Sequence, residues 1–218
     1  MPVMVGYDNV EDLPYVDHRG KRLYYPRNTP KGNIEQSYRN LMTEQDVESP
    51  HRYVKSYDEL KSKILLDVGA AEGIFALEVI DLVEKAYLFE CNEKWLEPLN
   101  ASFKPWKEKT EIVRKYVSNS DFDKSVTIDT YMKGKGYDNI HLKMDIEGAE
   151  QEALKGSKAL LTKGKSISCS VCTYHKKEDA KAICSFFESL GYTYELSQGY
   201  FFAVPYLRKG ICRVRKSQ

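Results

Sequence analysis

The sequence lacks any apolar run that approaches the roughly 20 residues needed to cross a bilayer, so we expect no membrane-spanning segment and no membrane partner. Its start, MPVMVGYDNVEDLPY, has no basic stretch followed by an apolar stretch, so no signal peptide is predicted. Internal repeats and low-complexity segments are also missing. These absences indicate an ordinary globular protein, which we expect to be cytoplasmic.

An excess of charge of either sign is missing too. The 33 basic residues are balanced by 32 acidic ones, which leaves a formal net charge of +1. Such a balance disfavours polyanion binding through bulk charge, so we expect no nucleic-acid partner, although a local basic patch stays compatible with it. At 218 residues, of which 42% are hydrophobic, the chain is long enough for one domain with a sizeable core.

The five cysteines are an odd number without the spacing of a disulfide framework. Cys169 and Cys172 form a CxxC, but they lie in the strand-like run SISCSVC. Side chains three apart on a strand point to opposite faces, which suits neither a redox pair nor a metal clip. We therefore expect reduced core cysteines, as is typical of cytosolic proteins.

From residue 63 onward, short apolar runs alternate with helical patterns. Strands are predicted at KILLDV (63–68), AYLFE (86–90), EIVRKYV (111–117), IHLKMD (140–145) and SISCSV (166–171). Helical patterns separate most of these runs, which predicts an α/β fold with a mostly parallel sheet covered by helices on both faces. The last strand-like stretches, YTYELS, YFFAVP and GICRVRK, have no helices between them and predict an antiparallel edge.

Residues 1–60 do not follow this alternation. They contain a predicted hairpin, YVDHRGKRLYY, which turns near Arg19-Gly20, and a short helix in IEQSYRNLMTEQD. We interpret 1–60 as an extension packed on a main domain that covers 61–218. Its end, Ser49–Tyr53, precedes the first strand of that domain, and we expect it to close over the functional site as a lid and to supply polar groups to the acceptor or cofactor. The alternative is a segment that only covers one face of the sheet.

A glycine turn, Asp67-Val68-Gly69-Ala70-Ala71-Glu72-Gly73, lies where the first strand of the main domain becomes the first helix. In an open α/β sheet, ligands bind at this carboxyl end of the strands. Glu90 follows the second strand about 20 residues later, where a carboxylate can accept hydrogen bonds from both ribose hydroxyls. The turn and the acid together predict a nucleoside cofactor, with a turn that simply packs a helix as the alternative.

The residues of the turn favour S-adenosylmethionine over NAD. A dinucleotide site needs G-x-G-x-x-G, but Ala71 replaces the middle glycine and Glu72 would set a carboxylate beside a phosphate. S-adenosylmethionine has no phosphate and carries a sulfonium and an ammonium group. The carboxylates of Asp67 and Glu72 are compatible with such a cation.

A second acidic turn, Asp145-Ile146-Glu147-Gly148-Ala149-Glu150, ends the fourth strand, and His175 follows the fifth. Because these strand ends share one edge of the sheet, a carboxylate and an imidazole there can activate a hydroxyl group. We predict Asp145 and His175 as catalytic residues and Glu147 as an orienting one, while Glu150 fits a first-turn acid of the next helix. A metal held by Asp, Glu and His is an alternative, but we predict none.

The blocks ILLDVGAAEG, LFECNE, SVTIDTYM, HLKMDIEGAEQEALKG and TYHKKEDA resemble those of FkbM-type S-adenosylmethionine-dependent methyltransferases, over most of residues 15–190. The resemblance implies a class I methyltransferase (Rossmann-like) fold, whose seven-stranded sheet has one antiparallel strand. It also implies O-methylation of a sugar or secondary-metabolite hydroxyl. Members commonly have a proline after the acid of the second strand, whereas Cys91 follows Glu90 in this chain.

We therefore predict an S-adenosylmethionine-dependent O-methyltransferase that acts on a small-molecule or glycan hydroxyl. The predicted cofactor-binding residues are Asp67, Gly69, Ala70, Glu72, Gly73, Glu90, Cys91 and Asp145. An RNA or DNA methyltransferase and a non-catalytic nucleoside-binding module remain alternatives. The nucleic-acid alternative depends on a basic C-terminal stretch that contains Arg208, Lys209, Arg213, Arg215 and Lys216.

Overall fold

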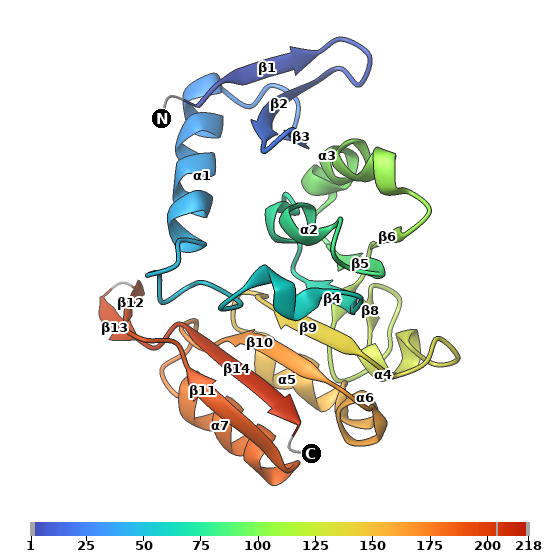
Figure 1. The fold of residues 1–218 in the computed structure, drawn as a ribbon, viewed down its shortest axis with the longest axis vertical. Helices are drawn as coiled ribbons and strands as arrows, with labels where there is room; N and C mark the ends of the chain where they lie inside the picture. Colours follow the sequence, from blue (N-terminus) through green and yellow to red (C-terminus); the bar gives the residue numbers. More distant parts are fainter. Residues whose placement is uncertain (1–2, 204, 217–218) are drawn as a thin grey trace.

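A seven-stranded sheet forms the centre of the molecule in the computed structural model, which describes residues 3–203 and 205–216 (Figure 1). The strands lie in the order β11-β14-β10-β9-β4-β5-β6. Their bounds are β4 (Ile64–Val68), β5 (Lys85–Phe89), β6 (Thr110–Val113), β9 (Ile140–Met144), β10 (Ser168–Cys172), β11 (Tyr192–Leu196) and β14 (Ile211–Lys216). Only β14 runs antiparallel to its neighbours in this sheet, which confirms the predicted sheet of seven strands with one antiparallel member.

Two expectations about strands are wrong in detail. YTYELS and GICRVRK form β11 and β14, an antiparallel pair at one edge of the sheet as predicted, but YFFAVP lies outside this sheet. The predicted strand 111–117 is broken into β6 and the short β7 (Tyr116–Val117), which pairs with β8 (Ser125–Val126) in a separate ladder.

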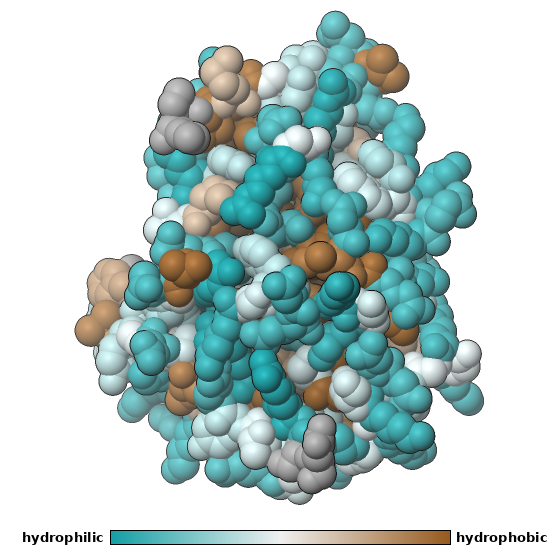
Figure 2. All heavy atoms as spheres, viewed as in Figure 1, coloured by the Kyte–Doolittle hydropathy of each residue, from teal (hydrophilic) through white to brown (hydrophobic). Residues whose placement is uncertain are grey.

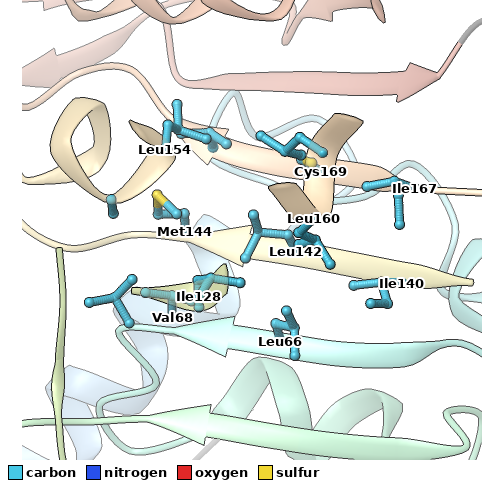
Figure 3. Close-up of a cluster of buried hydrophobic side chains, with 14 of the residues drawn as sticks. Leu66, Val68, Ile128, Ile140, Leu142, Met144, Leu154, Leu160, Ile167 and Cys169 are labelled. Carbon is cyan, nitrogen blue, oxygen red and sulfur yellow. The ribbon is translucent and has the colours of Figure 1, made fainter. Parts of the chain in front are cut away.

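Helices cover both faces of the sheet, as predicted. One face carries α4 (Ile128–Tyr131), α5 (Glu150–Lys155), α6 (Lys158–Lys163) and α7 (Asp179–Ser189). Figure 3 shows the core beneath them, where Leu66, Leu142 and Cys169 project from three neighbouring strands. The other face carries α2 (Ile74–Val79) and α3 (Glu93–Phe103), which continues into η2 (Lys104–Trp106). Cys172 belongs to this second core, so the CxxC cysteines do point to opposite faces.

The N-terminal segment packs beside α2 and α3. It forms a small antiparallel sheet of β1 (Val5–Asp8), β2 (Leu13–His18) and β3 (Lys21–Tyr24), then α1 (Lys31–Glu44) and η1 (Tyr57–Leu60). The predicted hairpin turn at Arg19-Gly20 is confirmed, with both residues in the left-handed region. The Tyr24 amide donates a hydrogen bond to Ser102 Oγ on α3 (3.0 Å), and Ile34 of α1 enters the same core as α2. The lid function of this segment stays a prediction.

A second hairpin, β12 (Phe201–Ala203) and β13 (Tyr206–Arg208), stands off the main sheet. Figure 2 shows a mostly hydrophilic face with apolar side chains at its left edge, where Figure 1 places this hairpin. Within the described residues, no helix has the length and apolar character needed to cross a membrane. Met1, Pro2, Val204, Ser217 and Gln218 belong to the predicted domain ranges but lie outside the described residues.

Candidate active site

The glycine turn after β4 brings two strand ends into contact. Gly69 has φ of 80°, and its amide and that of Ala70 donate hydrogen bonds to the Phe89 carbonyl at the end of β5 (3.0 and 3.1 Å). A Cβ atom on Gly69 would lie 1.9 Å from the backbone oxygen of Asp145. Only glycine therefore allows the turn to lie against the end of β9.

Gly73 has a different role from the one predicted by its place in the motif. It caps α2 with φ of 82°, and an added Cβ would lie 2.7 Å from Leu99 and 2.8 Å from Phe103 on α3. The need for glycine here comes from helix packing. A contact of Gly73 or of the buried Ala70 with the cofactor stays a prediction.

Glu90 lies where the sequence places it, directly after β5, and its carboxylate is held on both sides. Oε2 accepts a hydrogen bond from the Ala71 amide in the turn (2.8 Å), and Oε1 accepts one from the Asn92 amide (2.6 Å). A carboxylate has about four lone-pair sites, so both oxygens keep capacity for further donors. Cys91, the next residue, is only partly buried.

Asp67 forms an ion pair with Lys143, which the sequence did not predict. Its Oδ1 lies 2.8 Å from Lys143 Nζ, and this ammonium also donates a hydrogen bond to the Gly69 carbonyl (2.6 Å). Both side chains are buried. Asp67 therefore fixes the turn through Lys143, which lowers its availability for a cofactor. A lysine inside the otherwise apolar strand IHLKM was the signal for such a buried partner.

The surroundings of the turn carry an excess of negative charge. Burial first, and to a smaller extent the carboxylates of Asp67 and Glu44, raise the pKa of Glu72 to about 7 against the opposing charge of Lys143. Burial and the charge of Asp145 raise the pKa of Glu44 to about 7 in the same way. A bound cation beside these buried carboxyl groups would favour their ionised form. This suits the positively charged S-adenosylmethionine.

Asp145 is the centre of a polar cluster at the end of β9. Tyr53 donates a hydrogen bond to its Oδ2 (2.7 Å), and the Tyr174 hydroxyl lies 3.3 Å from its Oδ1. Burial alone would raise the pKa of Asp145, but the positive Lys143 and the Tyr53 hydroxyl outweigh burial and hold it below its usual value. Asp145 is therefore ionised at neutral pH.

The structure brings the predicted pair of Asp145 and His175 together. His175 Nε2 lies 3.4 Å from Asp145 Oδ1 and 3.6 Å from Glu147 Oε2, while Nδ1 lies 2.9 Å from Glu150 Oε1. Burial lowers the pKa of His175, but these carboxylates, with Glu150 first, raise it above its ordinary value. The Glu147 side chain is 94% exposed, so its orienting role stays a prediction. Glu150 begins α5, as expected, but it is fully buried.

His51 is a second imidazole beside Asp145, and it comes from the N-terminal segment. Its Nε2 lies 2.6 Å from the Tyr174 hydroxyl and 3.7 Å from Asp145 Oδ2. Burial lowers its pKa to about 4, so His51 is neutral at neutral pH, whereas the pKa of His175 is raised by its carboxylate neighbours. The predicted lid segment Ser49–Tyr53 thus supplies two polar groups to the site, His51 and Tyr53.

Two groups of side chains have the composition of a metal site, namely His51, Asp145 and Cys172, and Asp145, Glu150 and His175. In the second group, the two ring nitrogens of His175 face different carboxylates, Asp145 and Glu150. The ring therefore lies between the carboxylates and, as an imidazolium, supplies the positive charge that an ion would supply. The absence of a metal stays a prediction.

A cavity of about 280 Å³ lies towards the starts of β9 and β10, whereas Asp145 lies at the end of β9. Its main polar groups already have partners within the protein. His141 contacts Ser168 Oγ (2.9 Å) and Ser170 Oγ (3.3 Å), and Arg213 donates hydrogen bonds to the carbonyls of Tyr53 and Arg52. We therefore place the functional site at the strand ends and not in this cavity.

The comparison with protein families agrees with the predicted resemblance. The profile of the methyltransferase FkbM domain matches residues 94–194, which confirms the resemblance over that stretch. Residues 94–194 are therefore similar to this methyltransferase domain, and S-adenosylmethionine is the cofactor that the similarity indicates, as predicted. No curated protein matches this chain.

Three solved structures with the same fold are distant from this chain in sequence. A methyltransferase FkbM from Methylobacillus flagellatus KT is 18% identical with a TM-score of 0.52, and the match covers 86% of this chain but only 55% of that one. An S-adenosylmethionine-dependent O-methyltransferase from Thermotoga maritima is 15% identical (TM-score 0.51; 85% of this chain, 65% of that one). An rRNA methylase from Streptococcus thermophilus is 16% identical (TM-score 0.52; 85% and 96%). These likenesses establish the class I methyltransferase fold.

Substitution of Gly69 by alanine tests the contact between the turn and β9. Gly69→Ala places a side chain at positive φ and against the Asp145 backbone, so we expect it to lower the free energy of unfolding by about 3 kcal/mol or more. Gly20→Ala is the matched control: its φ is 82°, but nothing lies within 4 Å, so we expect a loss of about 1 kcal/mol. Urea denaturation measures both. Equal losses would contradict the proposed contact.

Proposed function

We propose that this chain, which matches the methyltransferase FkbM domain over residues 94–194, transfers a methyl group from S-adenosylmethionine to a hydroxyl group of a small molecule or glycan. The observation that carries the proposal is the cluster around Asp145. An ionised carboxylate, an imidazole and two phenols meet at the end of β9, directly beside the glycine turn. This set of groups can bind a hydroxyl group and remove its proton.

The residues at the turn suit the proposed cofactor. Glu90 would hold the ribose diol with its free lone pairs, and the turn at Gly69 would lie against the methionine part. The sulfonium and ammonium charges would be attracted by Glu72, Glu44 and Asp145. When bound, S-adenosylmethionine supplies an electrophilic methyl group whose transfer removes one positive charge from the sulfur.

An aliphatic hydroxyl is a poor nucleophile while it is protonated, so a base must stand beside the acceptor. We assign this role to His175, whose Nε2 faces Asp145. Asp145 would accept a hydrogen bond from the acceptor or stabilise the imidazolium that forms. Because the carboxylates raise the pKa of His175, the neutral base becomes available only at a pH above its ordinary value of about 6.5.

The nucleic-acid alternative depends on the basic C-terminal stretch, whose side chains are held in place by the fold. All five basic side chains of the C-terminal stretch have partners within the protein. Arg208, Lys209, Arg213 and Lys216 donate hydrogen bonds to backbone carbonyls, and Arg215 pairs with Glu59. Arg213 and Arg215 also pair with the carboxylates of Glu195 and Glu59, whereas backbone carbonyls leave the positive charge of the other three side chains in place. The rRNA methylase named above shares the fold, so the acceptor panel includes RNA as the alternative. A non-catalytic nucleoside-binding module would bind cofactor without turnover, which an acceptor panel would reveal.

The role of Glu90 can be tested without knowing the acceptor. Glu90→Ala should weaken the binding of S-adenosylhomocysteine by roughly 10- to 150-fold, because a charged hydrogen-bond partner of the ribose is lost. Titration calorimetry measures the affinity. The control is Glu93→Ala at the start of α3, which removes an exposed carboxylate that pairs with Arg114 and should leave the affinity unchanged. Unchanged affinity in Glu90→Ala would end the assignment.

The catalytic assignment is tested by His175→Ala and Asp145→Asn on a panel of sugar and polyketide hydroxyl acceptors. His175→Ala should lower kcat by about 10²–10⁴ with nearly unchanged cofactor affinity, since a general base contributes about that much to the rate. The wild-type rate should rise with pH through one ionisation above about pH 6.5. Near-normal kcat in His175→Ala with an inactive Asp145→Asn would make the carboxylate the base. Normal turnover in both would move the chemistry elsewhere.

A further inference from the structure

Glu150 is a charged residue that the proposed reaction leaves unused. Its side chain is fully buried at the start of α5. Oε1 accepts a hydrogen bond from the Ile146 amide (2.9 Å), whereas Oε2 has no hydrogen-bond partner among the described residues. A buried carboxylate is costly unless a positive group lies beside it, so Glu150 needs a cationic neighbour.

His175 is the group in that position. Its Nδ1 lies 2.9 Å from Glu150 Oε1, in the geometry of an ion pair and not of a straight hydrogen bond. Its Nε2 lies 3.4 Å from Asp145 Oδ1, and the ring packs on that of Tyr174 with 4.3 Å between the centroids. One nitrogen therefore faces a carboxylate sealed in the protein, and the other faces the proposed site of the acceptor.

Among the groups around His175, Glu150 raises the pKa of its imidazole most. Three carboxylates lie near the ring, those of Asp145, Glu147 and Glu150. The phenol of Tyr174 packs on the ring, and the guanidinium of Arg208 donates a hydrogen bond to the His175 carbonyl. Lys143 and His51 lie close to Asp145. Glu147 is screened by water because its side chain is exposed. The charge of Asp145 is partly balanced by Lys143 and by the hydrogen bond from Tyr53, whereas Glu150 is nearest to the ring and fully buried.

We infer that Glu150 is the positioning residue of His175: its buried carboxylate holds the imidazole with Nε2 towards Asp145 and stabilises the imidazolium formed during methyl transfer. This inference rests on the proposed function. As the acceptor oxygen forms its bond to the methyl carbon, the carbon–sulfur bond breaks and the acceptor proton passes to His175 Nε2. The resulting positive charge lies between Asp145 and Glu150, in the manner of a carboxylate that orients a catalytic histidine.

The test follows the His175 ring directly, by a nuclear magnetic resonance titration with S-adenosylhomocysteine present. The resonance is assigned by its loss in His175→Gln. The wild-type midpoint should lie above pH 6.5, and Glu150→Gln should lower it by about one pH unit, because the amide keeps the size and the Ile146 contact but loses the charge. The rising limb of the pH–rate profile should move in the same direction, and kcat should fall by about 10- to 100-fold at unchanged cofactor KM.

Glu152→Gln is the matched control, since it removes an exposed carboxylate from the same helix that pairs with Lys155. It should leave both the titration and the rate unchanged. A wild-type midpoint of His175 at or below pH 6.5 overturns the inference. This measurement needs no Glu150 variant, so the inference can be tested even if Glu150→Gln does not fold. An unchanged midpoint in Glu150→Gln overturns it as well. If the midpoint moves as expected while no hydroxyl acceptor is methylated, the pairing stands and the proposed function fails.

Discussion

The buried ammonium of Lys143 is the interaction on which the geometry of the site depends. It pairs with Asp67 at the end of β4, donates to the Gly69 carbonyl in the turn, and lowers the pKa of Asp145 two residues further along its own chain. One positive charge thus joins the turn to the cluster around Asp145. Without it, three carbonyl or carboxylate groups would face one another inside the protein with no compensating charge.

Charge balance then decides what the site can hold. Glu44, Glu72, Glu90, Asp145 and Glu150 surround Lys143 and His175, so carboxylates outnumber cations even after Asp67 is paired. Burial first, and neighbouring carboxylates second, raise the pKa values of Glu44 and Glu72 at the turn, and the carboxylates around His175 raise its pKa against the effect of burial. A cationic methyl donor relieves the excess at the turn, and an imidazolium relieves it beside Glu150. The same group of buried carboxylates therefore favours a cationic cofactor and favours the protonated form of His175.

Features that depend on strand order and strand ends could be predicted from the sequence, whereas features that depend on long-range side-chain contacts could not. Glu90, Asp145 and His175 were found because parallel strands place their carboxyl ends on one edge. Ser49–Tyr53 was expected to supply polar groups to the site because it directly precedes the first strand of the main domain. That Tyr53 and His51 contact Asp145, across about 90 residues of chain, was not predicted, since no periodicity indicates such a contact. Burial of Glu150 was missed because an acid in a first helical turn is ordinarily exposed.

The most direct test compares the pH dependence of binding of S-adenosylmethionine and S-adenosylhomocysteine by calorimetry between about pH 6 and 8. The two ligands differ in the sulfonium charge, and effects of their common ammonium group cancel in the affinity ratio. Glu44 and Glu72, with pKa values of about 7, ionise across this range, and His175 loses its proton in the same direction. The account predicts that the ratio moves in favour of S-adenosylmethionine as pH rises. A ratio that is constant, or that falls with pH, would contradict an acidic site built for a cationic cofactor.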